Sequence, residues 1–337
     1  GEGRTTPRLS LQRDPPCQST SGDVGSSDGG NSVTVDAGTV SGSVYGGATN
    51  DGSAIGNHVV INGGTLGTTT SGTTTLHGLR LLALVQTGTS TATSLYGGYT
   101  TQGLASENTV TINEGTVSGS VYGGYTDSGN ATQNVVTLKG GSVSGTVYGG
   151  YTNNGTASGN TINVYGGDLT AASLNGGYGV TAATATAATE VSLLAVTAAT
   201  DASATGLSSS DNTLNVYTTG NTVAGVSNFQ NLNFYIPSTA VSGDTLLTVT
   251  GTADITNATV KAGIADATAL AENTQINLLS DENGITGVAT ATYGTLTDAG
   301  FATRSLTITH TDTDIYALVG PATAKNNDNN NSGTNTN

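Results

Sequence analysis

The sequence has no methionine, no tryptophan, one cysteine and five prolines in 337 residues. The single Cys17 excludes a disulfide scaffold, which needs paired cysteines. Lysine and arginine total 8 against 23 acidic residues, so the net charge is -15 and a basic stripe for nucleic acid is excluded. The apolar runs are much shorter than the roughly 18 residues of a membrane-spanning helix, so insertion of this chain into a bilayer is not expected.

Glycine and β-branched residues are abundant instead. The chain contains 50 glycines, and only 9% of its residues are charged, against about 25% in an average globular protein. Disordered chains are typically charged and poor in β-branched residues, whereas this chain is rich in Val, Ile and Thr. The composition therefore predicts an all-β, acidic protein with many turns.

An internal repeat of about 26 residues is the strongest signal in the sequence. Each unit begins with an asparagine and continues as in NTVTINEGTVSGSVYGGY, which starts at Asn108. The leading residues are Asn31, Asn57, Asn108, Asn134 and Asn160, separated by 26, 51, 26 and 26 residues, and Asn212 follows after 52. These intervals are close to one or two repeats, which puts the units in register along the chain.

Apolar and polar residues alternate within each unit. After Asn108, Val110 and Ile112 are apolar while Thr111 and Asn113 are polar, a period of two that indicates a β-strand with one buried face. Glycines follow where the chain must turn. One unit cannot bury its own apolar face, but stacked units can. We therefore predict an all-β fold, a parallel β-solenoid with repeats of about 26 residues.

Stacking similar units places identical side chains in columns. We expect the leading asparagines to form a ladder of side-chain amides. We also expect a ladder of rings from Tyr45, Tyr96, Tyr122 and Tyr148. The tyrosine column is either a structural ladder or an aromatic strip that faces a sugar, and these four residues are the candidate ligand-binding residues.

The repeat is interrupted twice and is absent from both ends. Segments 65–94 and 180–211 each carry roughly one extra unit of chain, and they are either degenerate coils or projecting loops that bind a ligand. Residues 1–20 match neither the repeat nor a signal peptide and are expected to be a disordered leader of foreign origin. The remaining expected divisions are a repeat solenoid over 21–235, irregular coils and a cap over 236–320, and a disordered polar tail over 321–337.

Two kinds of stretch resemble a known family. The repeats GTVSGSVYGGYT and NTVTI, and the stretch NFQNLNFYIPSTAVSGDTLLTVTGTADITNATVKAGI at 228–264, resemble the passenger domains of bacterial autotransporter outer-membrane proteins. The resemblance covers roughly 31–320. It implies a right-handed parallel β-helix that is secreted and displayed on the bacterial cell surface, with a glycan or host-surface molecule as its partner. Self-association into a fibre is a further alternative.

A polysaccharide-active enzyme is the alternative function. A glycosidase needs two carboxylates about 5–5.5 Å apart for retention or about 6.5–9.5 Å apart for inversion, and successive coils about 4.8 Å apart can supply such pairs. The candidate catalytic residues are Asp36, Glu114, Asp168, Glu190 and Asp201. No pair among them stands out, so the sequence favours a binding rod over a hydrolase or lyase.

No cofactor is expected, and no metal-ligating residue is assigned. The three histidines are far apart in sequence and match no metal-ligand spacing. The corner loops carry oxygen-rich residues, namely Asn50, Asp51, Asp127, Asn153 and Asn154. Such turns suit Ca²⁺, but Asx turns account for the same residues, so calcium is kept only as an alternative.

Overall fold

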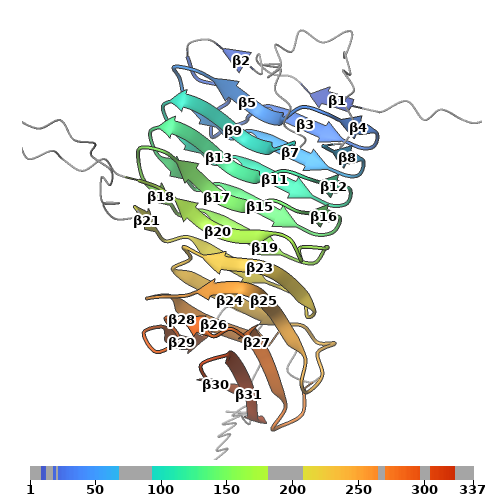
Figure 1. Ribbon diagram of the computed structural model, residues 1–337, viewed down its shortest axis with the longest axis vertical. Coiled ribbons are helices and arrows are strands. Elements are labelled where there is room, and N and C mark those ends of the chain that lie inside the picture. The colour runs from blue at the N-terminus through green and yellow to red at the C-terminus, as the bar shows by residue number, and fades with distance from the viewer. Residues whose placement is uncertain are drawn as a thin grey trace, which may run out of the picture.

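The computed structural model describes residues 9–12, 18–19, 22–67, 93–180, 208–264, 270–296 and 304–322. The regular structure of these residues consists of strands and contains no helix. Accordingly, this part of the chain offers no helix long and apolar enough to span a membrane. Successive strands lie one below the other, from β3 (Ser32–Val35) near one end to β31 (Asp314–Ala322) at the other, so the molecule is an elongated rod (Figure 1).

Sheet A is a ten-stranded sheet that runs along the rod. In spatial order, its strands are β1 (Leu9–Gln12), β3, β7 (His58–Ile61), β11 (Thr109–Ile112), β15 (Val135–Leu138), β19 (Thr161–Val164), β22 (Thr213–Val216), β24 (Asn231–Ile236), β26 (Thr259–Ile264) and β29 (Thr292–Thr295).

Sheet B has twelve strands and carries the candidate tyrosines. Its strands are β2 (Gln18–Ser19), β5 (Val44–Thr49), β9 (Leu95–Gln102), β13 (Val121–Ser128), β17 (Val147–Thr152), β20 (Ser173–Tyr178), β23 (Asn221–Ser227), β25 (Thr245–Asp254), β27 (Gln275–Asp281), β31 and β30 (Arg304–His310), with β28 (Ile285–Thr286) paired to β25.

Two narrow sheets lie between the wide ones in chain order. One contains β6 (Ala54–Ile55), β10 (Ala105–Ser106), β14 (Ala131–Thr132), β18 (Ala157–Ser158) and β21 (Ser209–Ser210). The other contains β4 (Thr39–Val40), β8 (Thr65–Leu66), β12 (Thr116–Val117) and β16 (Ser142–Val143). Along the chain, a strand of one sheet is therefore followed by strands of other sheets before the next strand of the first sheet is formed.

Strands within the stack pair in parallel, and partners are corresponding residues of successive units. Val110 pairs with Val136, and Tyr122 pairs with Tyr148. The intervals become less regular toward the C-terminal end, where hydrogen-bonded partners on adjacent strands are 18 residues apart at Asn215 and Asn233 and 33 apart at Thr259 and Thr292. The predicted all-β, parallel, solenoid-like stack is thus confirmed.

The core fills the inside of the stack as the alternating pattern predicts. In β11, Val110 and Ile112 are fully buried while Thr109 and Thr111 are half-buried. The first core column consists of Val33, Val59, Val110, Val136, Ile162, Leu214, Leu232 and Val260. This column continues into the C-terminal coils, where the repeat length changes, so one hydrophobic core runs through the described coils.

Both ends of the stack carry antiparallel strands. At one end β1 pairs antiparallel with β3. At the other, β31 pairs antiparallel with β27, and β30 pairs antiparallel with β31. Such strands cover edges that could otherwise pair with another molecule.

Most of the two interruptions, residues 68–92 and 181–207, lies outside the described residues, so the alternatives of degenerate coils and projecting loops stay open.

Candidate ligand-binding surface

A ladder of buried asparagine amides runs inside the corner that leads into sheet A. It consists of Asn31, Asn57, Asn108, Asn134, Asn160 and Asn212, all fully buried. Except at the last member, Asn212, each Nδ2 donates to the Oδ1 of the next asparagine at 3.0 Å. Within the ladder, for example at Asn134, Nδ2 also donates to a main-chain oxygen, that of Ala105, at 2.9 Å. The predicted amide ladder is confirmed, and it links successive coils through buried hydrogen bonds.

Paired glycines in sheet B leave space for the asparagine side chains of the amide ladder. In β13, Gly123 and Gly124 are both buried between the half-buried Tyr122 and Tyr125. A Cβ added at Gly124 would lie 2.5 Å from the Asn134 Nδ2, far inside van der Waals contact. Two consecutive inward residues break the alternation of the strand, so tyrosines three positions apart both face outward.

The predicted tyrosine ladder is present on sheet B. The rings of Tyr45 and Tyr96 stack with centroids 4.8 Å apart, those of Tyr96 and Tyr122 at 4.8 Å, and those of Tyr122 and Tyr148 at 5.1 Å. The planes are within 6° of parallel. At the next coil the column ends, because Asn175 of β20 pairs with Tyr148.

A second tyrosine ladder lies beside the first, and the sequence analysis missed it. It consists of Tyr99, Tyr125, Tyr151 and Tyr178, with centroid distances of 5.2, 5.1 and 4.9 Å. Its rings stand nearly perpendicular to those of the first ladder, as between Tyr122 and Tyr125 at 5.4 Å and 87°. The second tyrosine of the VYGGYT repeat was the available signal. We call the eight tyrosines of both ladders the tyrosine strip.

The tyrosine strip is a partly desolvated aromatic surface. Burial raises the pKa of Tyr96, and the neighbouring Tyr122 and Tyr45 raise it further. Burial also raises the pKa of Tyr122 and of Tyr148. These phenols therefore stay neutral over the physiological pH range, and the strip is half-buried along its length.

One carboxylate contacts the strip at its corner. The Tyr125 hydroxyl donates to Asp127 Oδ1 at 2.8 Å. Asn153 Nδ2, from the next coil, donates to the same Oδ1 at 2.9 Å and to the Tyr125 hydroxyl oxygen at 3.1 Å. The pKa of Tyr125 is raised first by burial and then by Asp127. Of the corner residues that suggested calcium, Asp127 and Asn153 are thus hydrogen-bonded to each other.

A smaller group of rings lies on sheet A. Tyr165, Tyr217 and Tyr235 stack with centroids 4.2 and 4.5 Å apart, and we call them the sheet A stack. Half-buried amides accompany it, since Asn215 Nδ2 donates to Asn163 Oδ1 and Asn233 Nδ2 to Asn215 Oδ1, both at 2.9 Å. Tyr165 is 41% exposed, so this group also reaches the surface.

The structure does not place the candidate catalytic carboxylates on adjacent coils. Asp36 follows β3, Glu114 follows β11 and Asp168 follows β19, and another strand of sheet A lies between each and the next. Two strand spacings correspond to about 10 Å, slightly more than the separation of about 6.5–9.5 Å in an inverting glycosidase. Glu190 and Asp201 lie outside the described residues.

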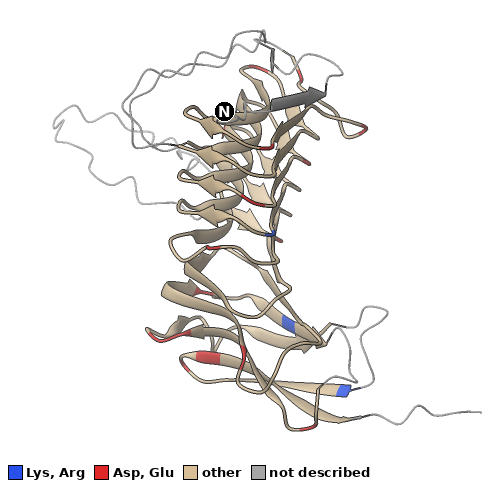
Figure 2. Ribbon diagram, turned by 90° about the vertical axis from the view of Figure 1, so that its right-hand side faces the viewer, with Lys and Arg blue, Asp and Glu red and all other residues tan. Residues whose placement is uncertain are grey.

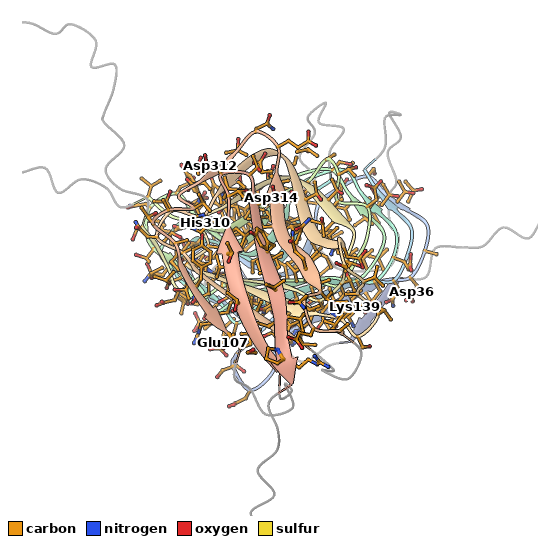
Figure 3. The ribbon with its side chains drawn as sticks, turned by 90° about the horizontal axis from the view of Figure 1, so that it is seen from below. Asp36, Glu107, Lys139, His310, Asp312 and Asp314 are labelled. Atoms are coloured by element: carbon orange, nitrogen blue, oxygen red, sulfur yellow. The ribbon has the colours of Figure 1, made fainter. Side chains whose placement is uncertain are left out.

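Asp36 and Asp168 are hydrogen-bonded to neighbouring side chains, and Glu114 is exposed. Asn62 Nδ2 donates to Asp36 Oδ1 at 2.8 Å. The hydroxyl and main-chain NH of Thr170 donate to Asp168, which lowers the pKa of that exposed carboxyl. Figure 3 shows Asp36 and Lys139 on the same side of the rod, away from Glu107. The charges are sparse along the ribbon (Figure 2), and the hydrolase alternative remains a prediction.

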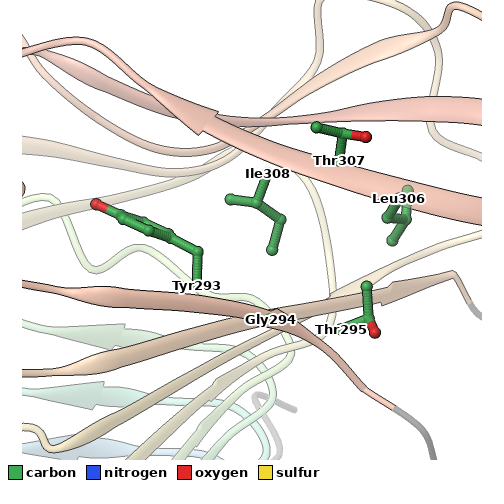
Figure 4. Close-up of a pocket in the computed structure, with 6 residues that line it drawn as sticks. All are labelled: Tyr293, Gly294, Thr295, Leu306, Thr307 and Ile308. Carbon is green, nitrogen blue, oxygen red and sulfur yellow. The ribbon is translucent and has the colours of Figure 1, made fainter.

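Metal-ligand clusters and pockets are the other features that could mark a site. In the described ranges, no group of three or more His, Cys, Asp or Glu side chains could hold a metal ion. A shallow pocket of about 250 Å³ lies between β29 and β30, lined by Tyr293, Gly294, Thr295, Leu306, Thr307 and Ile308 (Figure 4). Its lining contains no carboxylate, lysine, arginine or histidine, and its titratable group, the Tyr293 hydroxyl, donates to the main-chain oxygen of Val288 at 2.6 Å. The tyrosine strip is therefore the surface with the strongest claim to a function.

Comparisons with known proteins found no match among family models, curated proteins or solved structures.

Proposed function

We propose that this chain is the passenger domain of a bacterial autotransporter, a right-handed parallel β-helix with coils of about 26 residues. In this proposal it is displayed on the cell surface or released outside the cell. It binds a glycan or another host-surface ligand along its length, without a cofactor. Nucleic acid and a lipid bilayer are not among its partners.

The tyrosine strip is the observation that carries the proposal. Aromatic rings and hydroxyls repeat along the rod at the centroid spacing of 4.8–5.2 Å, which the strand spacing imposes. A polymer with repeating sugar units is a natural counterpart to such a surface, because successive units would meet equivalent side chains. Tyrosine also combines an apolar ring with a polar hydroxyl, a combination suited to partly wet interfaces.

Affinity in this scheme comes from many weak contacts. Each coil contributes one or two rings, and a ligand held at one coil is presented to the next at high effective concentration. Among the described residues, Asp127 is the one carboxylate that contacts a tyrosine of the strip. The strip therefore carries little charge, which suits a neutral or weakly charged polymer. We therefore expect binding that depends weakly on salt and strongly on the length of the polymer.

The test is retention of soluble polysaccharides of graded length on the immobilised chain. We expect retention to fall stepwise for Tyr45→Ala, Tyr148→Ala and the double variant, which alter the ends of the first ladder. Tyr165→Ala on sheet A is the matched control and should retain the ligand like the unaltered chain. Circular dichroism and urea unfolding would verify that each variant is folded.

Other results would overturn the proposal. Equal retention by all variants would remove the strip from binding. Release of new reducing ends would instead support the hydrolase or lyase alternative, with Asp36, Glu114, Asp168, Glu190 and Asp201 as the next residues to substitute. An apparent molar mass from light scattering that grows with protein concentration, without polysaccharide retention, would favour a self-associating fibre.

A further inference from the structure

The tyrosine strip gathers most of the easily oxidised side chains of this chain in one place. Methionine and cysteine are normally the first residues that oxidants attack, but the sequence has no methionine, no tryptophan and one cysteine, against 13 tyrosines. Eight of these tyrosines belong to the strip. An oxidant that reaches the rod therefore meets phenols as its principal targets.

The rings of the strip are close enough to share an oxidised site and to react with one another. Neighbours in the second ladder, Tyr99, Tyr125 and Tyr151, have centroids 5.2 and 5.1 Å apart with planes within 8° of parallel. Tyr125 also contacts the first ladder, at 5.7 Å from Tyr96 and 5.4 Å from Tyr122. The contacts continue without a break along both ladders.

Tyr125 differs from its neighbours because a proton acceptor is already in place. A phenol that loses an electron must also lose its proton, and the Tyr125 hydroxyl donates to Asp127 Oδ1 at 2.8 Å. Burial and Asp127 raise the pKa of Tyr125, so the phenol is protonated at neutral pH. Electron loss at this ring is thus coupled to proton transfer along an existing hydrogen bond.

We propose that the tyrosine strip is a site of oxidative cross-linking, in which Tyr125 is oxidised first and becomes joined to Tyr99 or Tyr151 of an adjacent coil. A one-electron oxidant takes an electron from Tyr125 while the phenolic proton passes to Asp127. A second equivalent oxidises the neighbouring phenol, whose proton passes to water.

The two phenoxyl radicals then couple through a ring carbon next to each phenolic carbon, which forms one carbon–carbon bond. The hydrogen on each coupled carbon moves to its phenolic oxygen, and both rings become aromatic again. The net change is the loss of two protons and two electrons, and two equivalents of oxidant are reduced. The product is a dityrosine that staples two successive coils, and it is independent of the ligand proposed above.

The sheet A stack supplies an internal comparison. Its rings are closer together, with centroids 4.2 and 4.5 Å apart. However, the Tyr217 hydroxyl interacts with the hydroxyls of Tyr165 and Tyr235, and these phenol neighbours together with burial raise the pKa of Tyr217. Among the described residues, none of the groups that shift the pKa of Tyr217 is a carboxylate. If proximity alone decided the reaction, the sheet A stack would react first, whereas a proton acceptor favours the strip.

The experiment exposes the folded full chain to photogenerated ruthenium(III) tris-bipyridine, a one-electron oxidant, for short times. Dityrosine fluorescence gives the rate, and mass spectrometry of peptides locates the cross-link and its loss of two hydrogens. We expect the first cross-links to join Tyr125 to Tyr99 or Tyr151 within one molecule. Tyr125→Phe should remove them while the ring packing is retained.

Asp127→Asn should slow the first cross-link roughly tenfold, the factor that corresponds to losing one charge-assisted hydrogen bond, and Asp127→Glu should restore part of the rate. Asp51→Asn, at an exposed corner, is the matched control and should react like the unaltered chain. Equal yields from the folded and the urea-unfolded chain would overturn the proposal, as would first cross-links in the sheet A stack or an unchanged rate in Asp127→Asn.

Discussion

Gly124 lies against the side-chain amide of Asn134, so closely that a Cβ at Gly124 would lie 2.5 Å from the Asn134 Nδ2. The same contact recurs between Gly150 and Asn160. It joins the interior of the rod to its surface, because the glycines that admit the amide ladder also turn both tyrosines of VYGGYT outward. The buried ladder and the tyrosine strip are thus two consequences of one local arrangement.

Two glycines of one coil should respond very differently to alanine. At Gly150 an added Cβ would lie 2.6 Å from the Asn160 Nδ2, within the ladder. Overpacking of a core costs about 1–3 kcal/mol, and strained hydrogen bonds add to it, so we expect Gly150→Ala to lower the free energy of unfolding by roughly 3 kcal/mol. Urea unfolding of the purified variant measures this.

Gly159→Ala is the matched control. Gly159 has a φ of 65°, but its added Cβ would meet no atom closer than 3.6 Å. Gln133 adopts a φ of 57° at the equivalent position of the preceding coil, so a side chain is tolerated there. The left-handed conformation costs roughly 1 kcal/mol, and this should be the limit of the loss. Equal losses for the two variants would contradict the role assigned to the glycine pair.

The amide ladder should be least tolerant of substitution in its middle. Asn134 accepts hydrogen bonds from the main-chain NH and Nδ2 of Asn108, and it donates to Ala105 and Asn160. Asn134→Ala leaves several buried polar groups without a partner, each worth about 1–3 kcal/mol. We expect a loss of roughly 3–5 kcal/mol in the free energy of unfolding, measured with urea.

Two asparagines outside the interior of the ladder provide the comparison. Asn31 begins the ladder, and its buried Oδ1 has no hydrogen-bond partner among the described residues, so Asn31→Ala breaks fewer bonds and should cost roughly 1 kcal/mol. Asn113 Nδ2 donates to Asn62 Oδ1 in an exposed pair at 2.8 Å, and Asn113→Ala should cost less still. Equal losses in the free energy of unfolding at Asn134, Asn31 and Asn113 would show that the ladder is not a main source of stability.

The repeat made much of this architecture predictable. Identical side chains at equal intervals must form columns when units stack, so the Asn108–Asn134 and Tyr96–Tyr122 contacts follow from the spacing of the sequence. The buried positions of β11 follow from its alternation. In a periodic sequence the repeat interval predicts which distant residues are in contact, whereas most sequences give no such indication.

The remaining features depend on departures from that period. The second tyrosine ladder was missed because simple alternation puts Tyr122 and Tyr125 on opposite faces, and only the two consecutive buried glycines bring them together. Carboxylates such as Asp36 and Asp168 occur once in their columns, so the repeat says nothing about their partners. The pairing of Asn215 with Asn233 at an interval of 18 residues likewise has no counterpart in the regular units.

The rings of the strip should contribute more to stability in the middle than at the end. Tyr122 packs against the rings of Tyr96, Tyr125, Tyr148 and Tyr151. Tyr45 packs only against the rings of Tyr96 and Tyr99 among the described tyrosines.

Each aromatic pair is worth about 0.5–1.5 kcal/mol. We therefore expect Tyr122→Ala to cost about 1–3 kcal/mol more than Tyr45→Ala in urea unfolding. The corresponding Phe variants keep the rings and should lie close to the unaltered chain. A larger loss at Tyr45 than at Tyr122 would show that ring stacking is not what these positions contribute.

The rod should unfold cooperatively in alkali. Burial raises the pKa of seven strip tyrosines, which are Tyr45, Tyr96, Tyr99, Tyr122, Tyr125, Tyr148 and Tyr151. In the unfolded chain the pKa of tyrosine is about 10. Above that pH the unfolded chain binds fewer protons than the folded one, so the stability falls as pH rises. This contribution is intact below about pH 10 and is lost as the pH climbs toward the raised folded values.

Phenolate absorbance and circular dichroism, followed together during a titration with base, test this expectation. Both should change in one transition, because the strip ionises when the coils separate. Tyr122→Phe removes one phenol whose pKa is raised and keeps the ring, so it should move the alkaline midpoint to higher pH. Ionisation of the strip tyrosines near pH 10 with an unchanged circular dichroism signal would mean that their hydroxyls are fully solvated, contrary to the burial that raises the pKa of Tyr96 and Tyr122.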